Sequence, residues 1–200
     1  MARYCFYVDG FNMYHALQEG YPQYKWLNYR RLAEAAVLAR DTIESVVYFT
    51  AFTYWKALQV NRHKVYVKAL RWAGVEVVQG RFMRKTATCH RCHRTYVTHE
   101  EKRTDVNIAV RVLSDAVADS YDRAVVVSAD SDLLPVVKAT HEIAPGKEIG
   151  IMFPIGRSSV DLKIHADFTR KMPQSLLRAS QLPDEIPLGS TTIRKPISWP

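Results

Sequence analysis

This chain of 200 residues has few cysteines, no long apolar run and no pattern typical of a signal peptide. The three cysteines, an odd number, argue against a disulfide framework in a chain of this size. No apolar run approaches the roughly 20 residues that a membrane-spanning helix needs. The N-terminus enters a strand-like run directly, without the longer apolar stretch and cleavage site of a signal peptide. We therefore expect a cytoplasmic protein with no membrane partner.

Acidic residues are the minority charge. The chain has 28 Lys and Arg against 20 Asp and Glu, which gives a formal net charge of +8. This excess favours a polyanionic partner, although surplus lysine often serves only solubility. Hydrophobic residues make up 48% of the chain, enough to bury a core, and the length suits one α/β domain.

Strand-like and helix-like hydrophobic periods alternate along the chain. The spacing predicts strands over 3–8, 45–52, 75–82, 123–128 and 149–153, and helices over 11–18, 29–37, 55–73, 106–117, 133–140 and 173–181. Such alternation implies parallel pairing through right-handed crossovers. The sequence thus predicts a three-layer, Rossmann-like α/β fold with a central, mainly parallel sheet of five or six strands. We expect the basic stretch after residue 82 to be irregular and the proline-rich tail over 182–200 to be extended.

Four aspartates lie where one fold would bring them together. The first strand ends at Asp9, the fourth is followed by Asp130 and Asp132, and Asp105 opens the helix before the fourth strand. In an open parallel sheet, ligands bind beyond the carboxyl ends of the strands. Carboxylates gathered there repel one another unless a cation neutralises them, and oxygen-only ligands suit Mg²⁺ or Mn²⁺.

Each aspartate alone also has a purely structural explanation. Asp105 and Asp132 are suitable helix caps, and Asp9 with Gly10 suits an ordinary turn. The convergence of all four on one edge favours a metal site instead. Ser128 is a candidate to orient a neighbouring acid, or else makes a local hydrogen bond.

Three motifs in this order and spacing resemble those of a known family: Val8-Asp9-Gly10-Phe11-Asn12, Lys102-Arg103-Thr104-Asp105-Val106-Asn107-Ile108-Ala109 and Ser128-Ala129-Asp130-Ser131-Asp132-Leu133. They are similar to the motifs of NYN-domain (LabA-like) proteins in the PIN-like nuclease superfamily, from about Arg3 to Phe168. The resemblance implies a PIN-like domain over 1–170. The residues themselves indicate a basic Cys-x-x-Cys insert in it at about 83–101, and a C-terminal helix and extended tail over 171–200. The resemblance further implies the metal-binding acids Asp9, Asp105, Asp130 and Asp132, and Asn12 as the polar residue that assists the first acid.

The resemblance also implies an activity, that of a metal-dependent endoribonuclease that hydrolyses RNA and leaves a 5′-phosphate. Mg²⁺ or Mn²⁺ would orient the phosphate, activate a water and stabilise the leaving oxygen. Within this catalytic set Asn12 would hold a water or a metal ligand, because an amide does not titrate. The alternative is a non-catalytic RNA-binding or scaffold module on the same fold. The acidic edge argues against this alternative, because without a bound metal its carboxylates weaken the binding of a polyanion.

The segment 81–103 concentrates positive charge. Its seven Lys or Arg against two Glu supply five of the chain's eight net charges beside Asp105. We predict that single-stranded RNA enters here along Arg81, Arg84, Lys85, Arg91, Arg94, Lys102 and Arg103. Phe82 and Tyr96 are candidates for stacking on bases, or else are buried aromatic residues of a solvated loop.

Cys89 and Cys92 have the spacing of a zinc knuckle. A second Cys-x-x-Cys is absent, so the remaining ligands of a structural Zn²⁺ would be His93 or His99, or would come from a second subunit of a homodimer. The alternative is a pair of unligated thiols. Cys5, inside the first strand, is expected to be a small core residue.

Overall fold

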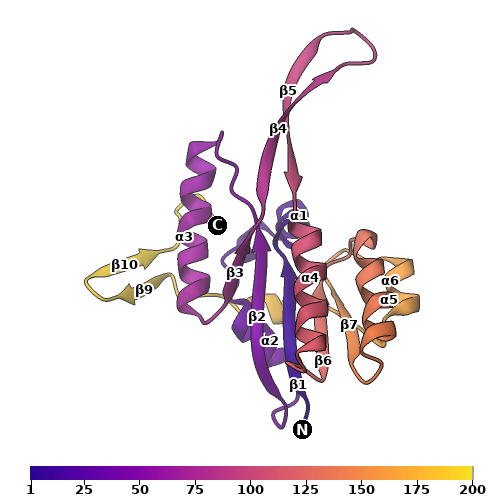
Figure 1. The fold of residues 1–200 in the computed structure, drawn as a ribbon. Coiled ribbons are helices and arrows are strands. Elements are labelled where there is room, and N and C mark those ends of the chain that lie inside the picture. The colour runs from indigo at the N-terminus through magenta and orange to yellow at the C-terminus, as the bar shows by residue number, and fades with distance from the viewer. Residues whose placement is uncertain (200) are drawn as a thin grey trace.

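The computed structural model describes residues 1–199, which are built around a six-stranded sheet (Figure 1). The strand order is β3-β2-β1-β6-β7-β8, and every neighbouring pair is parallel. The strands are β1 (Arg3–Asp9), β2 (Thr42–Thr50), β3 (Glu76–Gln79), β6 (Arg123–Val127), β7 (Glu148–Phe153) and β8 (Phe168–Lys171). The predicted α/β fold with a central parallel sheet is confirmed.

Helices cover both faces of the sheet (Figure 1). One face carries α1 (Gly10–Gly20), α2 (Tyr29–Ala36), α3 (Ala57–Trp72) and α7 (Gln174–Ala179), and the other carries α4 (Thr104–Val117), α5 (Leu134–Ile143) and α6 (Val160–His165). Successive β1 residues alternate between the two cores: Tyr4 and Phe6 join the first, Cys5 and Tyr7 the second. β1 is therefore buried on both faces, and Cys5 is a core residue as expected.

Local signals set the ends of several helices. Asn28 caps α2, because its Oδ1 accepts the Arg31 N–H at 3.1 Å. Pro135 lies in the first turn of α5, where its missing N–H costs nothing. α3 stops just before Gly74, whose φ of +78° suits glycine. In residues 1–199 no helix combines the length and apolarity needed to cross a membrane.

The basic stretch after β3 is a β-hairpin, so the expectation of irregular structure was wrong. β4 (Arg81–Thr88) and β5 (Thr95–Lys102) pair in antiparallel fashion and project from the main sheet (Figure 1). The predicted strand 75–82 breaks at Gly80, where the chain passes so close to α4 that a Cβ would lie 2.8 Å from Thr104 Oγ1. The hairpin leaves no hydrophobic signal because neither of its strands has a fully buried residue.

The C-terminal tail, expected as an extended segment, forms two short paired strands that pack on the domain. After α7 the chain forms the hairpin of β9 (Glu185–Leu188) and β10 (Thr191–Arg194). Ile186 and Ile193 are buried in the core, and Trp26 Nε1 donates to the Pro183 carbonyl at 2.8 Å. These short elements, like α6, β8 and the single turns η1 (Pro22–Tyr24) and η2 (Ser131–Leu133), are too brief to show a hydrophobic period.

Candidate metal centre

The strand order reverses between β1 and β6. The chain continues from β1 to β2 and β3 on one side, while β6, β7 and β8 lie on the other. Loops that leave two such strands diverge and open a crevice at the carboxyl edge. Asp9 ends β1 and Asp130 follows β6, so the pairing of these strands brings the two acids to the same crevice. β1 and β6 are therefore neighbours in the sheet, as the prediction required.

Three carboxylates meet at this edge. Oxygens of Asp9, Asp105 and Asp130 all lie within 4.8 Å of one another. Asp9 is 4% exposed, and the other two are more accessible. Among residues 1–199, none of the three forms an ion pair with a basic side chain. Three carboxylates at this spacing, none of them paired with a basic side chain, fit a hard divalent cation such as Mg²⁺ or Mn²⁺.

Hydrogen bonds fix the carboxylate of Asp9. Its Oδ1 accepts the backbone N–H groups of Phe11 at 3.1 Å and Asn12 at 3.0 Å, so Asp9 also caps α1. Its Oδ2 accepts the Ser128 hydroxyl at 2.8 Å. Ser128 Oγ in turn accepts the Asp130 N–H at 3.1 Å. Asp9 therefore both caps α1 and belongs to the carboxylate group. Ser128 links it to Asp130, the other acid at a strand end.

Gly10 is required directly after Asp9. A Cβ at this position would lie 2.5 Å from the Phe49 carbonyl oxygen and 2.6 Å from the ring of Tyr48. No real side chain tolerates such contacts, so only glycine lets α1 start against β2. This close approach fixes the direction in which the Asp9 carboxylate leaves β1.

Asn12 joins α1 to the loop after β6. Its Oδ1 accepts the Ala129 N–H at 3.0 Å. This bond holds the start of α1 against the loop that carries Asp130, which makes Asn12 a positioning residue. The side-chain NH₂ is left for the predicted contact with a water, and that contact stays a prediction.

Asp132 stands apart from the other three acids. It lies exposed in η2, and its N–H donates to Asp130 Oδ1 at 3.0 Å. Among the described residues, the group of carboxylates close enough to share one ion does not include Asp132. Three of the four predicted ligands thus converge, and the charge of the fourth contributes to raising the pKa of Asp105.

Burial and mutual repulsion perturb the acids. Burial raises the pKa of Asp9 above its ordinary value, although its hydrogen bonds with Asn12 and Ser128 oppose this. Burial, and then the charges of Asp9 and Asp130, raise the pKa of Asp105 to about 6. A cation bound between these carboxylates would lower the pKa values of Asp9 and Asp105 again, because its charge favours their ionised forms.

Mn²⁺ is expected to raise the melting temperature more at about pH 7.5 than at about pH 5. An ion at 100 times its Kd stabilises the folded state by about 2.7 kcal/mol. The pKa of Asp105 near 6 lies above its unfolded value, so protons stabilise the metal-free fold as the pH falls through 6 and compete with the ion. Thermal denaturation with Mn²⁺ at both pH values, against NaCl of equal ionic strength, measures this. An equal rise at both pH values would contradict it.

The acids line a cleft of about 360 Å³ that also holds residues absent from the prediction. Glu101, at the end of β5, accepts the Thr104 N–H at 3.2 Å and the Thr104 hydroxyl. His15 lies one helical turn after Asn12, a spacing that was visible in the sequence. Arg157 reaches the cleft from the loop after β7 and pairs with a glutamate of α1, and no local pattern predicts it.

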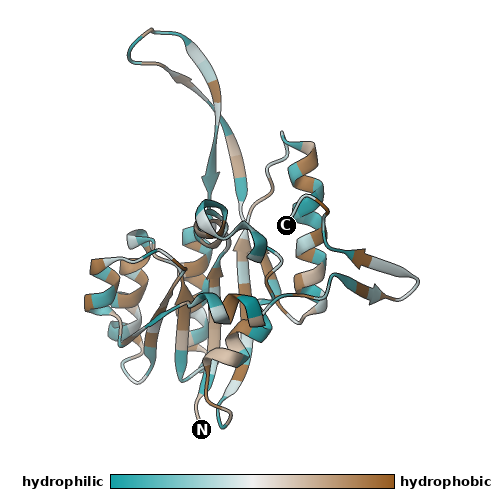
Figure 2. Cartoon of the chain, turned by 180° about the vertical axis from the view of Figure 1, so that it is seen from behind, coloured by the Kyte–Doolittle hydropathy of each residue, from teal (hydrophilic) through white to brown (hydrophobic). Residues whose placement is uncertain are grey.

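Aromatic packing fixes the base of the hairpin. Phe82 packs edge-on against Phe11, with ring centroids 5.5 Å apart, and against Trp55 at 4.8 Å. Of the two alternatives for Phe82, the packing role is therefore the one observed. Tyr96 is 54% exposed on β5, so its ring is open to a base. Figure 2 shows the hairpin standing clear of the other elements, with hydrophilic segments along much of its length.

The cysteines lie at the hairpin turn, away from His99. His99 pairs with Arg84 in the hairpin register and stacks on Trp55 at 3.6 Å. Within residues 1–199, only the aspartate group brings three potential ligand atoms within 4.8 Å. The prediction of His99 as a zinc ligand within one chain is therefore wrong, because the β register holds it several residues from the turn.

Comparisons with known proteins place the chain in a wider context. The model of the NYN domain family matches residues 3–170. The 6-hydroxy-3-succinoylpyridine 3-monooxygenase HspA of Pseudomonas putida (strain DSM 28022 / S16) is 26% identical over 235 aligned residues, which cover 96% of this chain and 74% of that protein. A crystal structure of a protein of unknown function from Vibrio parahaemolyticus RIMD 2210633 has a TM-score of 0.62 and 20% identity, over 90% of this chain and 96% of that one. This last likeness concerns the fold alone.

Proposed function

Because the chain belongs to the NYN domain family, we propose that it is a metal-dependent ribonuclease that hydrolyses RNA phosphodiester bonds with Mg²⁺ or Mn²⁺. One observation carries the proposal: the carboxylates of Asp9, Asp105 and Asp130, from three distant segments, meet within 4.8 Å. A bound divalent ion supplies Lewis-acid activation of the phosphate and of a water.

The chain's own residues hold this centre in place. Asp9 and Asp130 are oriented through Ser128, and Asn12 ties their two elements together. Asp9, Asp105 and Asp130 would hold the ion, whereas Asp132, outside the group of three, would add negative charge beside it. Arg157, at the edge of the cleft, is placed to contact a phosphate of the substrate.

The projecting hairpin supplies the RNA-binding surface in this proposal. Of its basic residues, Lys85 and Lys102 pair with Glu100 at 3.5 and 2.6 Å. Four arginines of the hairpin form no such ion pair among the described residues: Arg81, Arg84, Arg91 and Arg94. The three nearest the turn, Arg84, Arg91 and Arg94, are the main candidates for phosphate contacts. Because the hairpin ends at the start of α4, a strand bound along it leads to Asp105.

Two other functions have an observation in their favour. The projecting basic hairpin is equally suited to a non-catalytic RNA-binding or scaffold module. The monooxygenase among the relatives suggests a small nitrogen heterocycle as substrate. A pocket next to the acids, with Phe11, Tyr14 and Tyr66 among its lining residues, would suit one. We prefer hydrolysis of RNA because a small substrate leaves the basic hairpin without a role.

Cleavage of labelled single-stranded RNA by the purified protein tests the proposal. With Mn²⁺ or Mg²⁺ we expect products that carry 5′-phosphates, and with EDTA we expect none. RNA binding that is retained without metal-dependent cleavage would favour the scaffold. Turnover of 6-hydroxy-3-succinoylpyridine without RNA cleavage would favour the second alternative.

We also propose that Cys89 and Cys92 bind a structural zinc ion together with the same pair from a second copy of the chain. Both lie at the turn of a hairpin that projects from the domain, so two turns can meet. Hydrogen bonds from the backbone N–H groups of Cys92 and Arg91 lower the pKa of the Cys89 thiol, and zinc binds the thiolate. Four thiolates complete a tetrahedral site.

Cys89→Ser is expected to remove zinc and to convert a dimer into a monomer. Elemental analysis should give one zinc per two chains in the unmutated protein, and sedimentation should give the mass of a dimer. His99→Ala is the matched control and should retain the zinc, because His99 lies outside the turn. Zinc in a monomer would point to His93 as a ligand and contradict the shared site, and no zinc at all would end the idea.

A further inference from the structure

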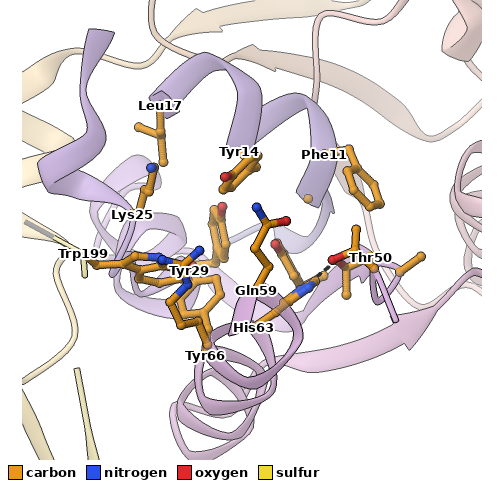
Figure 3. A pocket seen from close by; sticks show the side chains of 15 residues that line it. Phe11, Tyr14, Leu17, Lys25, Tyr29, Thr50, Gln59, His63, Tyr66 and Trp199 are labelled. Atoms are coloured by element: carbon orange, nitrogen blue, oxygen red, sulfur yellow. Dashed lines mark hydrogen bonds between the residues drawn. The ribbon is translucent and has the colours of Figure 1, made fainter. Parts of the chain in front are cut away.

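A second cavity, the aromatic pocket, lies beside the acidic cleft. Its volume is about 110 Å³, and its walls come from α1, the end of β2 and α3, with Trp199 of the C-terminal tail on one side (Figure 3). Phe11 lines both this pocket and the acidic cleft, so the two open next to each other. Apart from Gly10 and Tyr48, which set the start of α1, the other residues of the pocket have no role in the site described above.

Six of the fifteen residues that line the aromatic pocket are Phe, Tyr or Trp: Phe11, Tyr14, Tyr29, Tyr48, Tyr66 and Trp199. Several are held by one another, since Tyr29 stacks on Tyr48 and Trp199 packs edge-on against Tyr66, both with centroids 5.2 Å apart. Figure 3 shows Tyr14 above the cavity and Tyr66 below it. Rigid ring walls favour a planar aromatic ligand. An apolar cavity of roughly 150 Å³ accommodates benzene, so a pocket of about 110 Å³ has room for no more than one ring.

The charge of the aromatic pocket is positive and uncompensated. Lys25 and Arg62 line it, and no carboxylate does. Their hydrogen-bond partners are neutral: Lys25 donates to the Gln18 carboxamide, and Arg62 Nη1 donates to Ser198 Oγ at 2.8 Å. Arg62 Nε is buried without a partner among the described residues. Two cations with only neutral partners favour an anionic ligand.

His63 adds no charge to the pocket near neutral pH. It hydrogen-bonds with Thr50 at 3.0 Å, and burial lowers its pKa to about 4. The neutral imidazole and the amide of Gln59 instead offer hydrogen bonds to the polar edge of a ring. A ligand that satisfies the pocket therefore combines a flat heterocycle with an anionic group.

We propose that the aromatic pocket binds one pyrimidine nucleotide of the RNA strand, with its base among the rings and its phosphate between Lys25 and Arg62. This inference rests on the proposed ribonuclease function, because the shared wall at Phe11 places that nucleotide next to the bond to be cleaved. Stacking on aromatic side chains holds single-stranded bases in general, and the single-ring size selects pyrimidines over purines. The acidic cleft and the pocket then act on neighbouring parts of one strand.

Calorimetric titration of the metal-free protein with UMP tests the pocket without any need for cleavage. Uridine, ribose 5-phosphate and AMP should each bind about tenfold more weakly than UMP, because each lacks the base, the phosphate or the single-ring shape. Gln59→Trp, which fills the exposed mouth, and Arg62→Met, which removes a charge, should each weaken UMP binding about tenfold. Leu58→Trp is the matched control, since Leu58 is 82% exposed on the same helix and does not line the pocket.

A modified RNA links the pocket to the substrate strand. A single abasic residue beside the cleaved bond should raise KM about tenfold for the unmutated protein and not for Gln59→Trp. Unchanged UMP affinity in both pocket variants would overturn the inference. Nicotinate that binds more tightly than UMP and does not compete with RNA would overturn the choice of a nucleotide.

The two proposals fail separately. UMP binding that depends on Gln59 and Arg62, with no metal-dependent cleavage of RNA, would leave a nucleotide pocket and remove the ribonuclease. Metal-dependent cleavage with UMP binding insensitive to both substitutions would leave the ribonuclease and remove the pocket. Circular dichroism of each variant shows whether the fold is intact.

Discussion

Asp9→Asn is expected to lower the rate of metal-dependent RNA cleavage by about 1000-fold or more. The substitution removes the buried charge of the three-carboxylate group. A metal-bound transition state is stabilised by several kcal/mol, and each 1.36 kcal/mol corresponds to a tenfold change in rate. Asp130→Asn should have the same effect, whereas Asp132→Asn, outside the group, should cost about tenfold.

The fold should survive these substitutions. Asparagine retains an oxygen that accepts the N–H groups of Phe11 and Asn12, so the cap of α1 is kept. Burial raises the pKa of Asp9, which means that its charge opposes folding near neutral pH in the metal-free protein. The melting temperature of metal-free Asp9→Asn should therefore equal or exceed that of the unmutated chain.

Steady-state cleavage assays and thermal denaturation together measure both effects. Asp184→Asn makes the same chemical change in an exposed turn before β9, and it should leave the rate unchanged. Cleavage by Asp9→Asn at nearly the rate of the unmutated protein would exclude the acidic group as the catalytic centre. If Asp9→Asn loses both cleavage and the circular dichroism signal of the folded chain, its fold is damaged. The cleavage rate of Asp130→Asn then tests whether the acidic group is catalytic.

Replacing Arg84, Arg91 and Arg94 together with alanine is expected to weaken binding of single-stranded RNA about 100-fold at about 0.1 M salt. Each phosphate contact to a single strand contributes about −0.7 to the slope of log K against log salt. Three contacts thus account for a slope of about −2, which is about 100-fold between 1 M and 0.1 M salt. The same variant should show a salt slope shallower by about 2, and an unchanged kcat at saturating RNA.

Fluorescence anisotropy of labelled RNA across a salt series measures the slope. The matched control replaces three exposed cations outside the hairpin: Arg31, Arg40 and Lys138. If the control variant weakens RNA binding as much as the hairpin variant does, RNA is attracted by the net charge of the protein, and the hairpin has no special role. An unchanged slope in the hairpin variant would remove the hairpin from the RNA path.

Much of the candidate metal centre was visible in the sequence. Asp9 and Asp130 follow strongly apolar strands, and a parallel sheet that reverses its order between two strands must bring their ends together. Asp105 was placed by its position in the first turn of a helix and by the family resemblance. The spacing of Asn12 and His15 on α1 was equally visible, but only Asn12 belonged to a recognised motif.

The hairpin of β4 and β5, and the positions of its candidate zinc ligands, could not be predicted in this way. Periodicity reveals an element only when one of its faces is buried, and β4 and β5 have no fully buried residue. For the same reason the separation of His99 from the cysteines had no sequence signal, since it follows from the hairpin register. Phe82 was ambiguous because its partner rings, Phe11 and Trp55, come from other elements.

The sequence by itself determined the parallel α/β architecture, the strand-end acids and the concentration of positive charge before α4, because these depend on local periods and motifs. The tertiary structure alone decided that Asp132 lies outside the group of three and that Arg157 reaches the cleft. It alone assembled the aromatic pocket from α1, β2, α3 and the tail residue Trp199. Contacts between segments far apart in the chain depend on the packing of whole elements, and no local pattern encodes them.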